Sequence, residues 1–133
     1  SNSPPVNGIM ETSLYVDDLS ASTAFYQRVF GFAINFAVDR LVALAVRPGH
    51  VLLLFTKQGS VTLPRGAHHG DGNLHLAFAI DANQVEPWRA HLAAQSIVIE
   101  DEIHWDRGGV SLYFRDPDSH LLEVASPGVW QNY

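Results

Sequence analysis

Two stretches with the same pattern decide the fold of this chain: ETSLYVD at residues 11–17 and HLAFAID at residues 75–81. Each is a strand-like run with alternating side chains, and each closes on an aspartate. Each also opens with a side chain that can bind a metal ion, Glu11 in the first run and His75 in the second. The constant offset between the runs predicts two structurally equivalent halves.

The segments after these two runs have the same order in both halves. A helix-like segment comes first and three short strand-like segments follow, so the pattern predicts βαβββ twice. In the first half, Ser20 is the expected N-cap of a helix over residues 21–30, and Gly31 is its expected end. The remaining expected elements are strands at 9–16, 32–38, 41–46, 51–56, 73–80, 97–103, 109–115 and 120–125, and a second helix at 84–95.

This order predicts an α+β fold in which two βαβββ modules form a curved mixed-sheet cup around a metal site. We expect a single domain over residues 9–126, made of modules 9–56 and 73–126. The linker between them, residues 57–72, is rich in Gly, Pro and His. We interpret its His68-His69-Gly70 segment as solvated linker rather than as a metal-binding tract.

Composition excludes several classes of function. The 133 residues carry a formal net charge of −6, and the 8 Lys and Arg residues form no run, so we expect no nucleic-acid partner. The absence of cysteine excludes disulfides and thiolate metal ligands. No apolar run approaches the roughly 20 residues that span a bilayer, and no secretory signal is visible, so we expect a cytoplasmic protein without a membrane partner.

Four short motifs carry a resemblance to a known family. They are Tyr15-Val16-Asp17-Asp18-Leu19, Ala24-Phe25-Tyr26, Gly31-Phe32 and the segment FRDPDSHLLE at residues 114–123. Together they resemble the vicinal oxygen chelate superfamily, which includes glyoxalase I, extradiol dioxygenases, fosfomycin-resistance thiol transferases and bleomycin-resistance proteins. The Asp-Pro-Asp turn that leads into a strand containing a glutamate is the most specific of these motifs.

The resemblance implies a divalent metal ion held by Glu11, His75 and Glu123, which fall on the family's ligand positions. Oxygen-rich sites with one imidazole suit Mn, Fe, Zn or Ni, and geometry decides among these ions. The fourth protein ligand of metal-dependent glyoxalase I falls on Leu53, which cannot bind a metal. This departure counts against a standard glyoxalase I and implies a site with several open coordination positions.

Such a site suits enzymes that hold two neighbouring oxygens of a small substrate on the ion. The cation acts as a Lewis acid for the developing oxyanion, and Glu123 is the candidate catalytic group for moving a proton. Ser13 and Tyr113 are candidates for hydrogen bonds to the substrate. Trp105 is a candidate for lining the mouth of the cavity, and Arg107 for holding an anionic substrate.

Three classes of function stay open at this point. The first is a metal-dependent enzyme with lyase or isomerase, thiol-transferase or extradiol dioxygenase chemistry. The second is a metal-free protein that binds a small molecule such as an antibiotic, as bleomycin-resistance members do. The third is an interaction domain without an enclosed cavity. The resemblance further implies a homodimer, in which Glu11 of one chain can meet His75 and Glu123 of the other.

Overall fold

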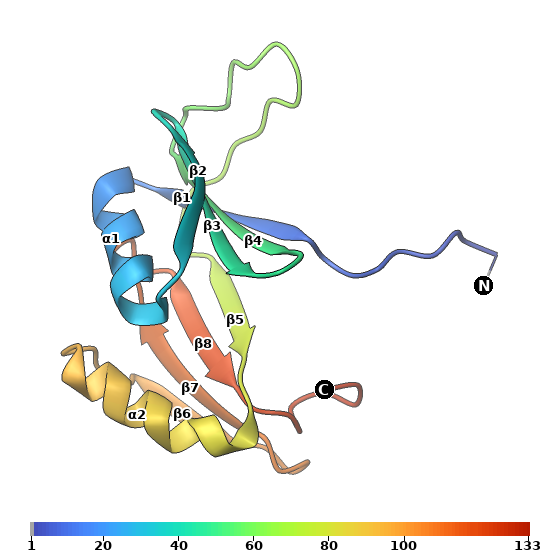
Figure 1. Ribbon diagram of the computed structural model, residues 1–133, viewed down its shortest axis with the longest axis vertical. Helices are drawn as coiled ribbons and strands as arrows, with labels where there is room; N and C mark the ends of the chain where they lie inside the picture. Colours follow the sequence, from blue (N-terminus) through green and yellow to red (C-terminus); the bar gives the residue numbers. More distant parts are fainter. Residues whose placement is uncertain (1) are drawn as a thin grey trace. The chain divides into compact units, whose positions relative to one another are not determined.

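The computed structural model describes residues 2–133, which form two compact units. The first unit ends at Gly70 and the second runs from Asp71 to Tyr133. Each unit contains one four-stranded mixed sheet and one α-helix in the order βαβββ (Figure 1), so the α+β class and the two modules are confirmed. Within residues 2–133, no helix is long and apolar enough to cross a membrane. The single domain over residues 9–126 stays a prediction.

The first unit builds its sheet in the order β1-β4-β3-β2, with β1 parallel to β4 and the other neighbours antiparallel. Its elements are β1 (Glu11–Val16), α1 (Leu19–Phe30), β2 (Ala33–Val38), β3 (Leu41–Arg47) and β4 (His50–Thr56). Strand side chains alternate between faces, so apolar residues on the helix side of the sheet can pack against α1. The buried side chains of this core are Leu14, Val16, Phe25, Tyr26, Val29, Leu44, Leu52 and Leu54.

Helix α1 begins earlier than the sequence pattern predicts. Asp18, rather than Ser20, is the N-cap: its backbone is extended, and its carboxylate accepts a hydrogen bond from the backbone N–H of Ala21 at 3.0 Å. Ser20 lies inside the first turn. Both residue types cap helices, but a carboxylate also carries the negative charge that the positive end of the helix dipole favours. The end of the helix at left-handed Gly31 is confirmed.

The other face of the first sheet carries a second apolar cluster. Leu41, Ala43 and Phe55 are buried there, and Tyr15 packs against them. His68 lies over this cluster with its ring centroid 4.5 Å from that of Phe55, and its Nδ1 lies 2.7 Å from the Tyr15 hydroxyl. The interpretation of this part of the linker as solvated is therefore wrong for His68, which is half-buried by aromatic packing.

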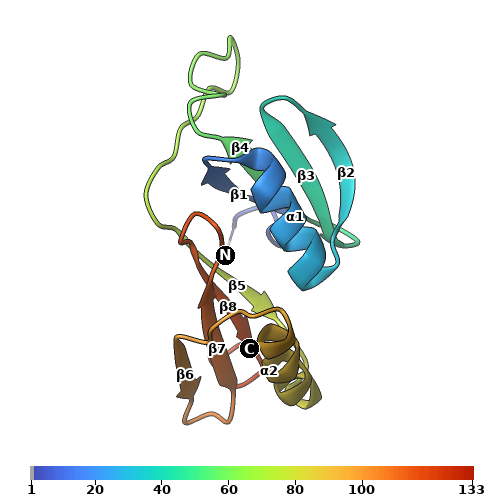
Figure 2. The same cartoon turned by 90° about the vertical axis from the view of Figure 1, so that its left-hand side faces the viewer.

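The second unit repeats the same plan with its sheet in the order β5-β8-β7-β6. Its elements are β5 (His75–Ala79), a short 3₁₀ turn (Ala82–Gln84), α2 (Val85–Ala94), β6 (Asp101–His104), β7 (Val110–Arg115) and β8 (Leu121–Ala125). Helix α2 lies against one face of this sheet (Figure 2). The side chains that form the buried core of this unit are Leu92, Leu112, Phe114, Leu122 and Val124.

An ion-pair network ties α2 to the edge strand β6. Arg89 on α2 bonds to Glu102 on β6, and His104 Nε2 lies 2.5 Å from the other oxygen of that carboxylate. The Arg89 guanidinium, and then His104, hold the pKa of Glu102 below its usual range. The strand predicted at 97–103 is shifted in the structure: β6 begins at Asp101, where its ladder with β7 begins, and it ends at His104.

As the N-cap of α1, the Asp18 side chain is expected to stabilise the protein. Replacing Asp18 by Ala removes the acceptor for the Ala21 N–H and should lower the free energy of unfolding by about 1 kcal/mol in urea titrations. The matched control is Ser20→Ala, which should change stability by less than about 0.5 kcal/mol. If Ser20→Ala destabilises the protein as much as Asp18→Ala does, the assignment of the cap is wrong.

Candidate functional site

The second unit brings two of the three predicted metal ligands together. His75 is the first residue of β5, and Glu123 is the middle residue of β8, the neighbouring parallel strand. Glu123 pairs with Ala77, so His75 is its diagonal neighbour on the same face, within reach of long side chains. The His75 Nε2 and Glu123 Oε1 atoms lie 3.2 Å apart.

The Glu123 carboxylate is buried, with 8% of its side chain exposed, and both of its oxygens have partners. Oε1 faces His75, and Oε2 accepts a 2.5 Å hydrogen bond from the Ser111 hydroxyl on β7. The Ser111 oxygen in turn accepts a 2.8 Å hydrogen bond from the indole Nε1–H of Trp105. A buried carboxylate needs such partners, because removing it from water without them is costly.

The His75 imidazole is oriented by the backbone. Its Nδ1 lies 2.8 Å from the carbonyl oxygen of Leu121, which can only accept a hydrogen bond. Nδ1 therefore carries the hydrogen, and Nε2 is the atom that faces Glu123. A hydrogen bond of this kind, from one ring nitrogen to a backbone carbonyl, is typical of histidines that bind a metal through the other nitrogen.

The Asp-Pro-Asp turn fixes the backbone beside this pair. The Asp116 carboxylate accepts hydrogen bonds from the backbone N–H groups of Asp118 and His120, each at 2.9 Å. The fully buried His120 ring accepts a 2.9 Å hydrogen bond from the backbone N–H of Leu74, the residue before His75. Ser111 and His120 are not predicted as site residues from the sequence, although both help to position the predicted ligands.

A cavity of about 460 Å³ opens beside the His75–Glu123 pair. Its walls are His75, Ala77, Phe78, Ala79, Trp105, Tyr113, Glu123, Ala125, Val129, Trp130 and Tyr133. This volume lies in the range of small-molecule sites. Tyr113 pairs with Glu123 across β7 and β8. Burial, and then the charge of Glu123, raise the pKa of Tyr113, which keeps its hydroxyl protonated and able to donate a hydrogen bond.

Of the four predicted substrate-binding residues, two line the cavity of the second unit and two do not. Tyr113 and Trp105 line the cavity of the second unit. Arg107 is exposed in the turn between β6 and β7 and is not among the lining residues. Ser13 is half-buried on β1 of the first unit, where it pairs with Leu53.

Strand register supports the equivalence of the two modules. Glu11 pairs with Val51 in the first unit as His75 pairs with Leu121 in the second. Leu53 thus holds the position in β4 that Glu123 holds in β8. Glu11 is exposed on β1, and within residues 2–133 no three His, Asp or Glu side chains form one metal-binding group.

Comparison with known proteins places this geometry in a family. The profile of the Glyoxalase/Bleomycin resistance protein/Dioxygenase superfamily matches residues 8–124. The metallothiol transferase FosB of Shouchella clausii is 28% identical over 121 residues, which are 90% of this chain and 80% of that protein.

Two solved structures extend the comparison. Lactoylglutathione lyase from Agrobacterium tumefaciens is 34% identical, with a TM-score of 0.90 over 96% of this chain and 99% of that one. FosX from Listeria monocytogenes, in a complex with Mn(II) and sulfate, is 23% identical, with a TM-score of 0.70 over 94% of each chain, and shows the shared fold. The chain therefore belongs to the Glyoxalase/Bleomycin resistance protein/Dioxygenase superfamily.

Proposed function

We propose that this protein is a metal-dependent enzyme that holds two neighbouring oxygens of a small substrate on a divalent ion. Glu11, His75 and Glu123 are the proposed protein ligands of that ion. The observation that carries the proposal is the 3.2 Å approach of His75 Nε2 to Glu123 Oε1, with Nδ1 held by the Leu121 carbonyl.

The chemistry of this contact favours a cation. A neutral imidazole that donates from Nδ1 has a lone pair on Nε2, and a carboxylate oxygen is also an acceptor. Two acceptors this close repel each other unless a positive charge is shared between them. A metal ion bound by both atoms supplies that charge, and one imidazole with two carboxylates suits Mn, Fe, Zn or Ni. The Mn(II) complex of FosX, a protein of the same fold, supports this choice of ion.

A bound divalent ion would supply a Lewis acid for negative charge that develops on the substrate oxygens. The protein's own groups surround that position. Tyr113 offers a hydroxyl donor from β7, and Glu123 can accept a proton when its carboxylate loosens. Ser111 holds Glu123 at Oε2, which leaves Oε1 directed at the ligand site. The reaction is of the lyase or isomerase, thiol-transferase or dioxygenase type.

Three assays separate these reaction types. Oxygen uptake with catechols identifies a dioxygenase, and turnover of hemithioacetals identifies glyoxalase-type chemistry. Loss of fosfomycin in the presence of a thiol identifies a transferase. The two relatives support different reaction types, since FosB is a metallothiol transferase and the protein from Agrobacterium tumefaciens is a lactoylglutathione lyase.

A metal-free binding protein is the second candidate. A single proton on His75 Nε2 would also resolve the contact with Glu123, as an imidazolium–carboxylate pair. Most residues that line the cavity are apolar or aromatic, which is sufficient to bind a small molecule without chemistry. This candidate predicts that divalent ions change neither the melting temperature nor ligand affinity.

The proposed ligands predict stoichiometric metal binding. Protein stripped with a chelator should bind one Mn²⁺ or Zn²⁺ per site in calorimetric titrations. Glu123→Gln should weaken the affinity by about 100-fold or more, because it removes a charged ligand from a buried position. The matched control is Glu100→Gln, an exposed carboxylate of the same unit that pairs with Arg115. Absence of a stoichiometric ion in the wild-type protein would refute the proposal.

We expect Ser111 to orient Glu123 for metal binding as well as to stabilise the fold. Ser111→Ala should lower stability by about 1–3 kcal/mol and weaken metal affinity by about 10- to 100-fold, because Glu123 loses the bond that orients it. Ser126→Ala is the control, since Ser126 is equally buried but bonds to the backbone of Val110. Equal metal affinities in both variants would show that Ser111 has no positioning role.

We further propose a homodimer in which Glu11 of one chain completes the site of the other. Mixing Glu11→Gln with Glu123→Gln chains, after unfolding and refolding together, should restore about a quarter of the wild-type metal sites, because only mixed dimers contain one intact site. If all three ligands belong to one chain, mixing restores no site. A monomeric protein in sedimentation experiments would equally contradict the shared arrangement.

A further inference from the structure

The cavity of the second unit is lined by two chemically different sets of side chains. His75, Glu123 and Tyr113 contribute polar groups, and Trp105, Trp130 and Tyr133 contribute aromatic rings. We infer that the substrate joins its chelating oxygens to an aromatic or other flat apolar group, and that Trp105 and Trp130 bind this group. This inference rests on the proposed function and names the class of substrate for the same site.

Hydrogen bonds of the indole and of the backbone hold Trp105 in place. Its indole Nε1–H donates to Ser111, the residue that also bonds to Glu123. The backbone of Trp105 closes the β6–β7 turn, because its N–H donates to the Gly109 carbonyl at 2.8 Å. One serine therefore bonds to both the Trp105 indole and the Glu123 carboxylate, which fixes the position of this ring relative to the carboxylate.

The segment that carries Trp130 is also built into the unit. Gly128 and Gly109 approach so closely that a Cβ on Gly128 would lie 2.5 Å from the Gly109 nitrogen. The Tyr133 carbonyl accepts hydrogen bonds from the N–H groups of Gly128, Val129 and Trp130, and the Tyr133 hydroxyl donates to the Ala125 carbonyl at 2.6 Å. This wall is ordered before any ligand arrives, which lowers the entropic cost of binding.

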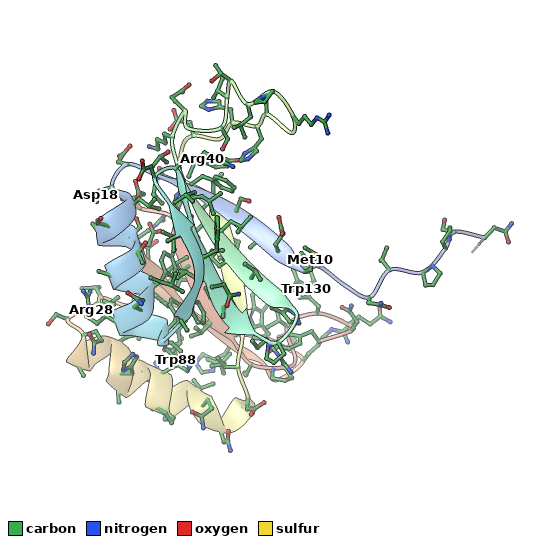
Figure 3. All side chains as sticks on the ribbon, turned by 45° about the horizontal axis from the view of Figure 1, so that its top comes forward. Met10, Asp18, Arg28, Arg40, Trp88 and Trp130 are labelled. Atoms are coloured by element: carbon green, nitrogen blue, oxygen red, sulfur yellow. The ribbon has the colours of Figure 1, made fainter. Side chains whose placement is uncertain are left out.

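Trp130, which is labelled in Figure 3, lines the cavity, yet its side chain is exposed. The exposed fraction of this residue is 70%. A large indole that stays in water gains from being covered by an apolar group. Three of the strand residues that line the cavity are small, namely Ala77, Ala79 and Ala125, so they leave space for a ring.

Charge argues against an anionic group beside the aromatic residues of the cavity. None of the residues that line this cavity in the second unit is Lys or Arg. A phosphonate or carboxylate tail would therefore find no cation in these walls to replace its hydration, whereas an uncharged ring loses little on leaving water. An uncharged aromatic tail therefore fits these walls better than an anionic tail does.

The test uses two probes that share one chelating head and differ only in the tail. Acetohydroxamate and benzohydroxamate both present two neighbouring oxygens, with a methyl and a phenyl group respectively. In calorimetric titrations of Mn²⁺-loaded protein, benzohydroxamate should bind about tenfold or more tightly. Trp130→Ala should reduce this preference to about threefold or less. Val98→Ala, which removes an exposed apolar side chain outside the cavity, should leave it unchanged.

A second arm uses chelator-treated protein, in which the phenyl preference should persist at lower affinity. Equal affinities of the wild-type protein for the two hydroxamates, or a preference that Trp130→Ala leaves at about tenfold or more, overturn the inference while the metal site stands. Failure of the wild-type protein to bind Mn²⁺ overturns the proposed function instead. In that case the phenyl preference of the metal-free protein decides whether the aromatic wall binds a ring.

Discussion

The burial of the Glu123 carboxylate is the constraint on which the rest of the site depends. A carboxylate in the interior of a β-sheet is costly unless both oxygens are satisfied. Here a serine hydroxyl satisfies one oxygen, and the Nε2 atom of His75 faces the other at 3.2 Å. The first contact fixes the carboxylate, and the second is favourable when a proton or a metal ion lies between the two atoms. Burial of the Glu123 carboxylate thus costs free energy, and the same burial makes the carboxylate suitable for binding a cation.

Two features of the sheet produce this arrangement. The parallel pairing of β5 with β8 sets His75 diagonally across from Glu123, and the antiparallel pairing of β7 with β8 does the same for Ser111. In the first unit, the same register brings Leu53 to the equivalent of Glu123. The two modules share a backbone plan, but the second pairs His75 with Glu123, whereas the first has Leu53 at the position equivalent to Glu123. The first offers Glu11 as a single carboxylate.

The sequence pattern predicted the features of the fold that depend on hydrophobic periodicity and on the order of helices and strands. Strand alternation predicted the strands that begin near Glu11 and His75, and the repeated order of elements predicted both modules. Ser111 could not be recognised as the partner of Glu123, because that contact depends on the register between two strands, which alternation within one strand does not reveal. His120 was missed for a related reason: its partner, the Leu74 N–H, lies on a segment distant in sequence. The choice between Asp18 and Ser20 as cap required the observed start of α1.

The protonation of the His75 ring tests the central claim most directly. Nitrogen-15 NMR spectra of the histidine side chains, assigned with a His75→Gln variant, report which nitrogen carries the hydrogen. The account predicts hydrogen on Nδ1 at all times, and a shift of the Nε2 resonance that saturates with one equivalent of Zn²⁺ and disappears in Glu123→Gln. A hydrogen that stays on Nε2 after stoichiometric Zn²⁺ is added would contradict it, since that nitrogen would then have no lone pair for a metal ion.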